Sequence, residues 1–245
     1  MGQIPKVEIL NVKLTPVTYH FLLNSIFSSE HKGFATLNSV HGIIESQNSQ
    51  LIKDSINNST FALCDGRPLY WALKNKFKDK FDHITGRVLM HKICQRAEKE
   101  NKSIGLYGGL EKNQEKCIDV LRRLYPKLKI DFVYAPPLMQ INEKENRDII
   151  NQINQSKIKY LFVCLGCPKQ EVWMNNHYKE LNCFLLGVGA ALDYIAGAIK
   201  PPPKIITNMG LEWLVRLLME PKRLFKRYFY IVPIFIYLMI KEKFN

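Results

Sequence analysis

Two short apolar runs, each followed at once by glycine, constrain the fold of this chain more than any other feature. They are Tyr160–Leu165 and Cys183–Leu186. A short run of large apolar residues that ends in glycine is typical of a buried parallel strand whose end faces a ligand. Pro168 stops the first strand from continuing, and a helix pattern follows it. The pattern predicts two adjacent strands of an open α/β sheet that hold a nucleotide at their carboxyl ends.

The chain before residue 200 alternates strand patterns with helix patterns. The other expected strands are Val7–Val12, Gly33–Leu37, Thr60–Cys64, Ser103–Tyr107 and Lys129–Val133. The expected helices are Pro16–Phe27, Val40–Gln47, Leu51–Asn57, Leu89–Asn101, Asn113–Tyr125 and Glu143–Gln155, with another from Leu69. Such alternation predicts a mostly parallel, Rossmann-like sheet with helices on both faces. We therefore expect an α/β catalytic domain over residues 1–199.

Residues 200–245 differ in composition and predict a separate, basic appendage. They begin with three prolines and carry nine Lys or Arg against three Glu, within a chain whose formal net charge is +13. Such a charge indicates an anionic partner, which can be nucleic acid, an acidic membrane surface or a phosphorylated substrate. We expect Pro233 to interrupt the aromatic run Tyr228–Ile240, which is also shorter than the roughly 20 residues that a spanning helix needs. We expect a helix that lies in the membrane interface.

Polar side chains at the predicted strand ends are the candidate catalytic residues. Asp65 follows a strand and precedes Gly66, so its carboxylate faces the crevice where ligands bind in such sheets. It is suited to take a proton from an attacking hydroxyl, and the alternative is an Asx-turn before Pro68. Thr36 and Asn38 share one face of a strand and either meet a ligand or cap the strand end.

Glycines at the strand ends are candidates for substrate binding. Gly108 and Gly109 open toward a helix, where backbone N–H groups can approach a diphosphate. Gly187 and Gly189 belong to a partial dinucleotide fingerprint, in which Leu192 stands where glycine or alanine is expected. The fingerprint is therefore weak support for a nicotinamide cofactor.

Cysteine and acidic residues indicate a reduced protein without a resident metal. Six cysteines show no disulfide-scaffold spacing, which favours a cytoplasmic protein. The Cys164-Leu165-Gly166-Cys167 motif lacks a second such pair or a histidine cluster for zinc. The chain has no D-x-D pair and no acidic cluster for a divalent cation. We expect neither a metal nor a cofactor.

Taken together, the motifs resemble the WecG/TagA/CpsF family of bacterial glycosyltransferases. The matching segments are Thr36–Asn38, Cys64–Gly66, Thr85-Gly86, Tyr107–Gly109, FVCLGCPKQE at 162–171, GVGAALDYIAG at 187–197, and GLEWLVR at 210–216. The resemblance extends over about residues 7–228. The combination of G-x-P-x-Q-E with a later G-L-E-W-L is specific to this family.

The resemblance implies a particular reaction. It implies an inverting, metal-independent transfer of a sugar from a UDP-sugar to a polyprenyl-diphosphate-linked sugar, in cell-surface polysaccharide or teichoic acid synthesis. The enzyme would sit peripherally on the inner face of the bacterial plasma membrane. N-acetylmannosamine is the best-known donor sugar, and its uronic acid, glucose and glucuronic acid remain alternatives.

The resemblance also assigns roles to residues. Asp65 matches the general base, and Thr36, Asn38 and Gln170 match residues that line the active site, while Asp193 matches the position that binds uracil. Candidates for binding diphosphates are Arg216, Arg223 and Arg227, together with the strand-end glycines Gly108, Gly109, Gly166, Gly187 and Gly189. His83, also a catalytic candidate, stands where the family often has Arg, and Val88 where it often has Asp.

Two other classes of function compete with the transferase. A nicotinamide-dependent oxidoreductase is disfavoured by the incomplete glycine fingerprint and by the lack of an acidic residue at a strand end about 20 positions later. A non-enzymatic basic module that binds membrane or nucleic acid would leave Asp65, Gly166–Glu171 and Asp193 unexplained. We expect no nucleic-acid partner, and a homo-oligomer remains open.

Overall fold

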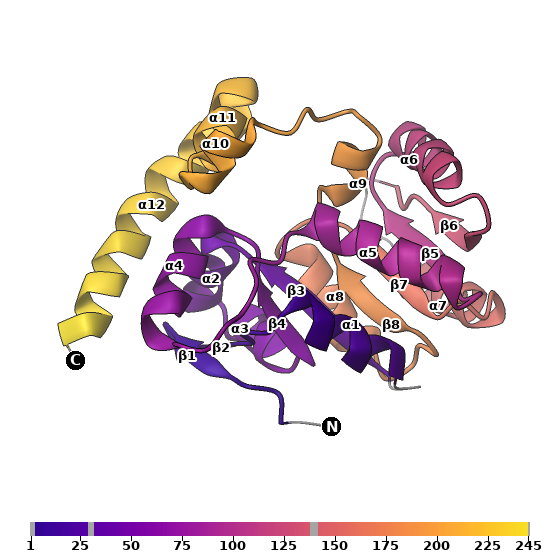
Figure 1. Cartoon of the computed structure of the whole chain (residues 1–245), viewed down its shortest axis with the longest axis horizontal. Coiled ribbons are helices and arrows are strands. Elements are labelled where there is room, and N and C mark those ends of the chain that lie inside the picture. The colour runs from indigo at the N-terminus through magenta and orange to yellow at the C-terminus, as the bar shows by residue number, and fades with distance from the viewer. Residues whose placement is uncertain (1–2, 29–31, 138–141, 245) are drawn as a thin grey trace.

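The computed structural model has a six-stranded parallel sheet at its centre (Figure 1). It describes residues 3–28, 32–137 and 142–244, but not the side chains of residues 204, 208, 223, 243 and 244. In spatial order the strands are β4 (Phe61–Cys64), β3 (Gly33–Asn38), β8 (Phe184–Gly187), β7 (Tyr160–Cys164), β5 (Ser103–Gly108) and β6 (Lys129–Tyr134). The predicted α/β class and the parallel sheet are confirmed, and β7 and β8 are neighbours as expected.

Helices cover both faces of the sheet. One face carries α1 (Tyr19–Ser28), α5 (Gly86–Lys99), α6 (Glu111–Leu124) and α9 (Ala191–Ile195). The other carries α2 (Val40–Asn48), α3 (Gln50–Asn57), α4 (Arg67–Lys76), α7 (Glu143–Gln155) and α8 (Lys169–His177). Successive residues of β7 alternate between the two cores: Phe162 packs with the first group, and Leu161 and Val163 with the second. This alternation is what buries a parallel strand on both sides.

The N-terminal segment corrects two predictions. The single strand expected over Val7–Val12 is instead an antiparallel hairpin of β1 (Val7–Ile9) and β2 (Val12–Leu14). Its two-residue turn places Leu10 and Asn11 at φ 50° and 60°, which no glycine in the sequence announces. The next helix begins at Tyr19 rather than at Pro16, because the Thr18 hydroxyl accepts the N–H of Phe21 and so starts the helix later.

The C-terminal tail consists of α10 (Lys204–Asn208), α11 (Glu212–Met219) and α12 (Pro221–Phe244), at one end of the sheet (Figure 1). Helix α12 runs through Pro233, so the interruption expected there is wrong. Its inner side buries Leu224, Ile231 and Phe235, and the last two share a core with the hairpin and α2. Within the described ranges, no helix is both long and apolar enough to cross a membrane.

Candidate active site

Asp65 stands at the carboxyl end of β4 and is held by three neighbouring segments. Its N–H donates to the carbonyl of Asn38 at 2.9 Å, and its Oδ1 accepts the N–H of Gly86 at 3.3 Å. The ring of His83 donates from Nε2 to the Asp65 carbonyl oxygen. The Tyr19 hydroxyl accepts the N–H of Thr85 at 3.1 Å and so braces the turn that presents Gly86. The carboxylate is therefore fixed in place at the sheet edge.

The surroundings of Asp65 favour its neutral form. Burial and, to a smaller extent, Glu212 of α11 raise the pKa of Asp65 to about 7, against the opposing effects of the Gly86 N–H and Arg216. When ionised, a carboxylate whose pKa lies near neutral pH is a better proton acceptor than an ordinary aspartate. Asp65 therefore has the chemistry that a general base requires.

Thr36 and Asn38 lie at the same sheet edge, directly behind Asp65. They are 0% and 2% exposed, and the Asn38 amide donates to the Thr36 hydroxyl at 3.0 Å and to the Leu63 carbonyl at 3.1 Å. The bond to Leu63 ties the end of β3 to the end of β4, and the bond to Thr36 orients the Asn38 side chain. Since the Asn38 carbonyl also accepts the Asp65 N–H, this arrangement supports Asp65.

Gln170 joins the first turn of α8 to the loop after β8. Its Oε1 accepts the N–H of Gly189 at 3.1 Å, and its Nε2 donates to Glu171 Oε1 at 2.9 Å. Burial raises the pKa of Glu171, whose Oε2 has no hydrogen-bond partner among the described residues. Gly187 lies against Gln170 and Met174, because a Cβ there would be 2.6 Å from the Met174 methyl. Gly166 is in the turn that precedes the helix.

The β5 end brings Gly108, Gly109 and Asp193 near one another. Gly108 and Gly109 have φ of +103° and +81°, which side-chain-bearing residues rarely adopt, and Gly109 packs against Leu192. Asp193 Oδ1 accepts from Asn113 Nδ2 at 2.7 Å. Asn113 is nearly buried in the first turn of α6, and the sequence patterns did not single it out. The bond fixes the carboxylate of Asp193 beside the glycine turn.

The three tail arginines that were predicted to bind diphosphates lie in different parts of the tail. Arg216 of α11 lies near Asp65 and Tyr194, and its buried Nε has no hydrogen-bond partner in the part of the chain that the structure describes. Arg227 of α12 lines a separate cavity of about 440 Å³, whose other walls are His41, Glu45, Cys167, Pro168, Lys226, Tyr230 and Ile231. Arg223 is in α12, and its side chain lies outside the described residues.

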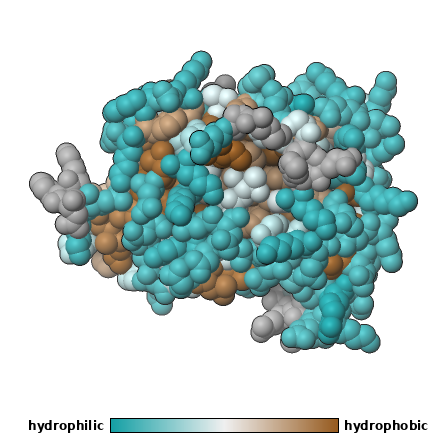
Figure 2. Space-filling view, turned by 90° about the horizontal axis from the view of Figure 1, so that it is seen from below, coloured by the Kyte–Doolittle hydropathy of each residue, from teal (hydrophilic) through white to brown (hydrophobic). Residues whose placement is uncertain are grey.

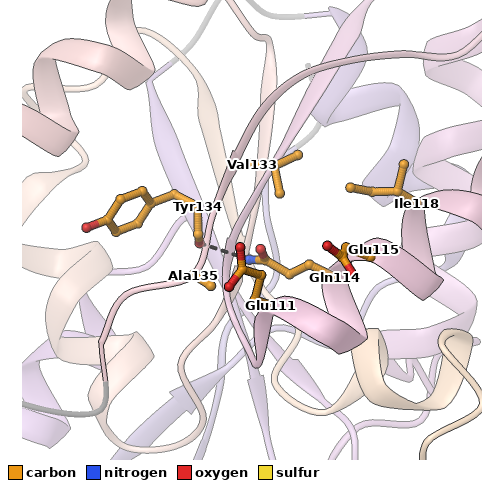
Figure 3. Close-up of a pocket in the computed structure, with 7 residues that line it drawn as sticks. All are labelled: Glu111, Gln114, Glu115, Ile118, Val133, Tyr134 and Ala135. Atoms are coloured by element: carbon orange, nitrogen blue, oxygen red, sulfur yellow. Dashed lines mark hydrogen bonds between the residues drawn. The ribbon is translucent and has the colours of Figure 1, made fainter.

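A further cavity, of about 320 Å³, lies between α6 and the end of β6 (Figure 3). Gln114 donates across it to the Tyr134 carbonyl at 2.9 Å, and Glu111 and Glu115 line it. Two carboxylates repel a diphosphate, so this cavity is a poor place for a nucleotide. The neighbouring turn at Gly109 and Asp193 is the better candidate.

Glu212 and Tyr194 are site residues that sequence reasoning missed. The Tyr194 hydroxyl donates to Glu212 Oε1 at 3.3 Å, and Glu212 acts on the pKa of Asp65. The GLEWLVR segment places Glu212 four residues before Arg216, and therefore on the same face of a helix. This spacing is the sequence feature that could have indicated Glu212 as a site residue.

A parallel sheet whose carboxyl edge carries a carboxyl group, glycine turns and a half-buried arginine is typical of an α/β enzyme that handles an anionic substrate. The family model described as "Glycosyl transferase WecG/TagA/CpsF family" matches residues 7–245. The chain belongs to this family of glycosyltransferases, which confirms the predicted membership and class of enzyme.

Named relatives come from Staphylococcus aureus. The proteins of strains MW2, NCTC 8325 and MRSA252 are each called N-acetylglucosaminyldiphosphoundecaprenol N-acetyl-beta-D-mannosaminyltransferase. Each is 29% identical to this chain over 196 residues, covering 79% of the chain and 74% of the relative.

Proposed function

We propose that this enzyme transfers N-acetylmannosamine from a UDP-sugar to N-acetylglucosamine linked to a polyprenyl diphosphate, with inversion and without a metal ion. The names of the Staphylococcus relatives support the sugar and the acceptor. The observation that carries the chemistry is Asp65, a fixed carboxylate with a pKa of about 7 at the carboxyl edge of the sheet. A single-displacement transfer needs one base, and Asp65 is suited to that role.

The proposed step balances as a direct displacement. The Asp65 carboxylate takes the proton of the acceptor hydroxyl, whose oxygen bonds to the anomeric carbon from the face opposite UDP. The bond between that carbon and the diphosphate oxygen breaks, and UDP leaves with the electron pair. One displacement inverts the anomeric configuration.

The donor is proposed to bind across the ends of β5 and β8. Backbone N–H groups of the turn at Gly108 and Gly109 would face the diphosphate, because successive N–H groups in such a turn can bind anions. Asp193, oriented by Asn113, would accept the uracil N–H. Arg216 supports metal independence, since an unpaired buried guanidinium N–H can take the charge that develops on the leaving UDP.

The acceptor is proposed to approach from the tail. The cavity beside α12 is lined by Lys226 and Arg227, together with His41 and Glu45, and its two cationic side chains are suited to a lipid diphosphate. On the outer side of the tail, Phe225 is 58% and Phe229 75% exposed, near the exposed Lys222 and Lys226. Such an aromatic and basic helix surface is typical of proteins that lie on anionic membranes.

Figure 2 shows the molecule from below, where hydrophilic residues predominate and hydrophobic patches lie among them. Contiguous exposed apolar residues mark interaction surfaces. Since Phe225 and Phe229 are exposed on α12, the proposed orientation puts the outer side of α12 on the inner face of the plasma membrane.

A panel assay tests the proposal. The purified protein is incubated with a lipid-linked N-acetylglucosaminyl diphosphate and each of several UDP-sugars, namely those of N-acetylmannosamine, its uronic acid, glucose and glucuronic acid. We expect UDP release and a disaccharide lipid with the N-acetylmannosamine donor, in EDTA, with inverted anomeric configuration by NMR. Transfer of another sugar would replace the donor assignment, loss of activity in EDTA would overturn metal independence, and a retained configuration would overturn direct displacement.

A further inference from the structure

Glu171 is a buried carboxyl that the proposed reaction does not use. It is the third residue of α8 and is 1% exposed, and its Oε2 has no hydrogen-bond partner among the described residues. Burying a carboxyl whose oxygens are not all hydrogen-bonded costs stability. A role in the neighbouring donor site accounts for its presence.

Glu171 holds one end of the Gln170 amide. Its Oε1 accepts a hydrogen bond from Gln170 Nε2 at 2.9 Å. At the other end of the amide, Gln170 Oε1 accepts the N–H of Gly189 at 3.1 Å. A backbone N–H can only donate and an ionised carboxylate can only accept, so both partners require the same orientation of the amide.

Gln170 in turn holds the loop after β8. This loop, residues 187–190, leads into α9, whose first turn carries Asp193. Gly187 leaves room for the Gln170 amide, since a Cβ there would be 3.2 Å from Nε2, and Gly189 has a φ of +53°. Because a loop with two glycines has wide backbone freedom, the hydrogen bond to Gln170 restricts its conformation.

We propose that Glu171 is a positioning residue for the donor: through Gln170 it fixes the loop between β8 and α9, and with it the place of Asp193. This inference rests on the proposed binding of the UDP-sugar across the ends of β5 and β8. It follows that Glu171 controls the affinity for UDP without touching it. The effect depends on the hydrogen bond to Gln170 and not on the bulk of the Glu171 side chain.

Substitutions at Glu171 separate the hydrogen bond from the packing. Glu171→Met keeps much of the volume and removes the acceptor, and we expect it to weaken UDP binding by about tenfold or more, the scale of one hydrogen bond to a charged group. Glu171→Gln keeps an acceptor oxygen and should bind UDP nearly as well as the parent. Calorimetry with UDP on the full-length proteins measures both, and cooperative denaturant unfolding shows that each variant is folded. In the transfer assay, Glu171→Met should raise the donor KM more than it lowers kcat.

Exchanging the two side chains is the sharper test. Gln170→Glu places a second carboxylate against Glu171 and removes the donor between them, so UDP binding should weaken. Combining Gln170→Glu with Glu171→Gln restores the hydrogen bond in the reverse direction, while the carboxylate at position 170 can still accept the Gly189 N–H. We expect the double variant to regain most of the UDP affinity that the single variant loses. A folded double variant that binds UDP no better than Gln170→Glu overturns the inference.

Glu145 provides the matched control. It is the third residue of α7 and is exposed, and its carboxyl accepts the N–H of Asn142 at 3.0 Å. Glu145→Met is expected to leave UDP affinity unchanged. A parent protein that does not bind UDP would contradict the proposed donor, whereas equal UDP affinity in the parent and in Glu171→Met would contradict only the role of Glu171.

Discussion

At the residue scale, Asp65 is held in surroundings that oppose its own ionisation. Burial and Glu212 raise its pKa, and the Gly86 N–H and Arg216 offset the shift only in part. A group that is costly to ionise in the folded protein lowers stability when it is ionised. The base strength that suits the proposed chemistry is therefore obtained at the expense of stability.

This cost predicts a pH-dependent effect of Asp65→Asn. The folded pKa of about 7 lies above the unfolded value, so between about pH 4 and 7 the folded state binds the extra proton and stability falls as pH rises. The Asn variant lacks this loss. In denaturant unfolding at pH 8, we expect the Asn variant to have a larger free energy of unfolding than the parent. At pH 5 the difference between the two proteins should be clearly smaller.

The exposed Asp131 of β6 provides the control. Asp131→Asn is expected to change the free energy of unfolding little at either pH, because surface substitutions are usually within about 0.5 kcal/mol. Equal effects of Asp65→Asn at pH 5 and pH 8 would mean that the carboxyl of Asp65 titrates normally.

Asp193 supports a prediction about donor binding. If its carboxylate accepts the uracil N–H, Asp193→Ala should weaken UDP binding by about 1.5–3 kcal/mol, the range for hydrogen bonds to charged groups. Asn113→Ala removes only the group that orients the carboxylate and should weaken binding by less. Calorimetry with UDP measures both, and unchanged affinity in the Asp193 variant would leave it a helix residue without a role in binding.

At the element scale, sequence patterns located the sheet better than its surroundings. Strands β7 and β8 were predictable because their apolar runs are short, buried and closed by glycine. The hairpin was not, since its turn at Leu10 and Asn11 uses left-handed backbone without glycine. Proline disfavours the interior of a helix, so the sequence indicated a break at Pro233. The helix α12 is nevertheless continuous, because packing of Ile231 and Phe235 on the core overrides this local preference.

Helix α12 supports a prediction about membrane binding. Phe225→Ser with Phe229→Ser removes two exposed aromatic side chains without touching the buried side of the helix. We expect the double variant to lose cosedimentation with acidic vesicles, while transfer to a water-soluble acceptor stays near the parental rate.

Leu124 of α6 is 54% exposed and offers a matched control far from the tail. Leu124→Ser should bind vesicles like the parent protein. Full vesicle binding by the double phenylalanine variant would exclude this surface of α12 as the membrane contact.

At the scale of the whole molecule, the candidate site is assembled from segments far apart in the chain. Asp65 and the glycines were predictable because they lie at or just after strand ends, and parallel strands bring their carboxyl ends to one edge. Gln170, in the first turn of α8, was indicated by the family resemblance. The contribution of Glu212 was not, since no periodicity relates a residue of α11 to a strand end almost 150 positions earlier. The expected division at residue 200 stays a prediction, and α12 shares a core with residues between Val7 and Phe81.

The most direct test of the central claim is the transfer rate of Asp65→Asn, measured with UDP-N-acetylmannosamine and a water-soluble analogue of the lipid-linked acceptor. The substitution keeps the size of the side chain and removes its ability to take a proton. We predict an intact fold, unchanged UDP affinity and a turnover lower by roughly 10²–10⁴-fold. A folded Asn variant that transfers sugar at nearly the parental rate would contradict the account.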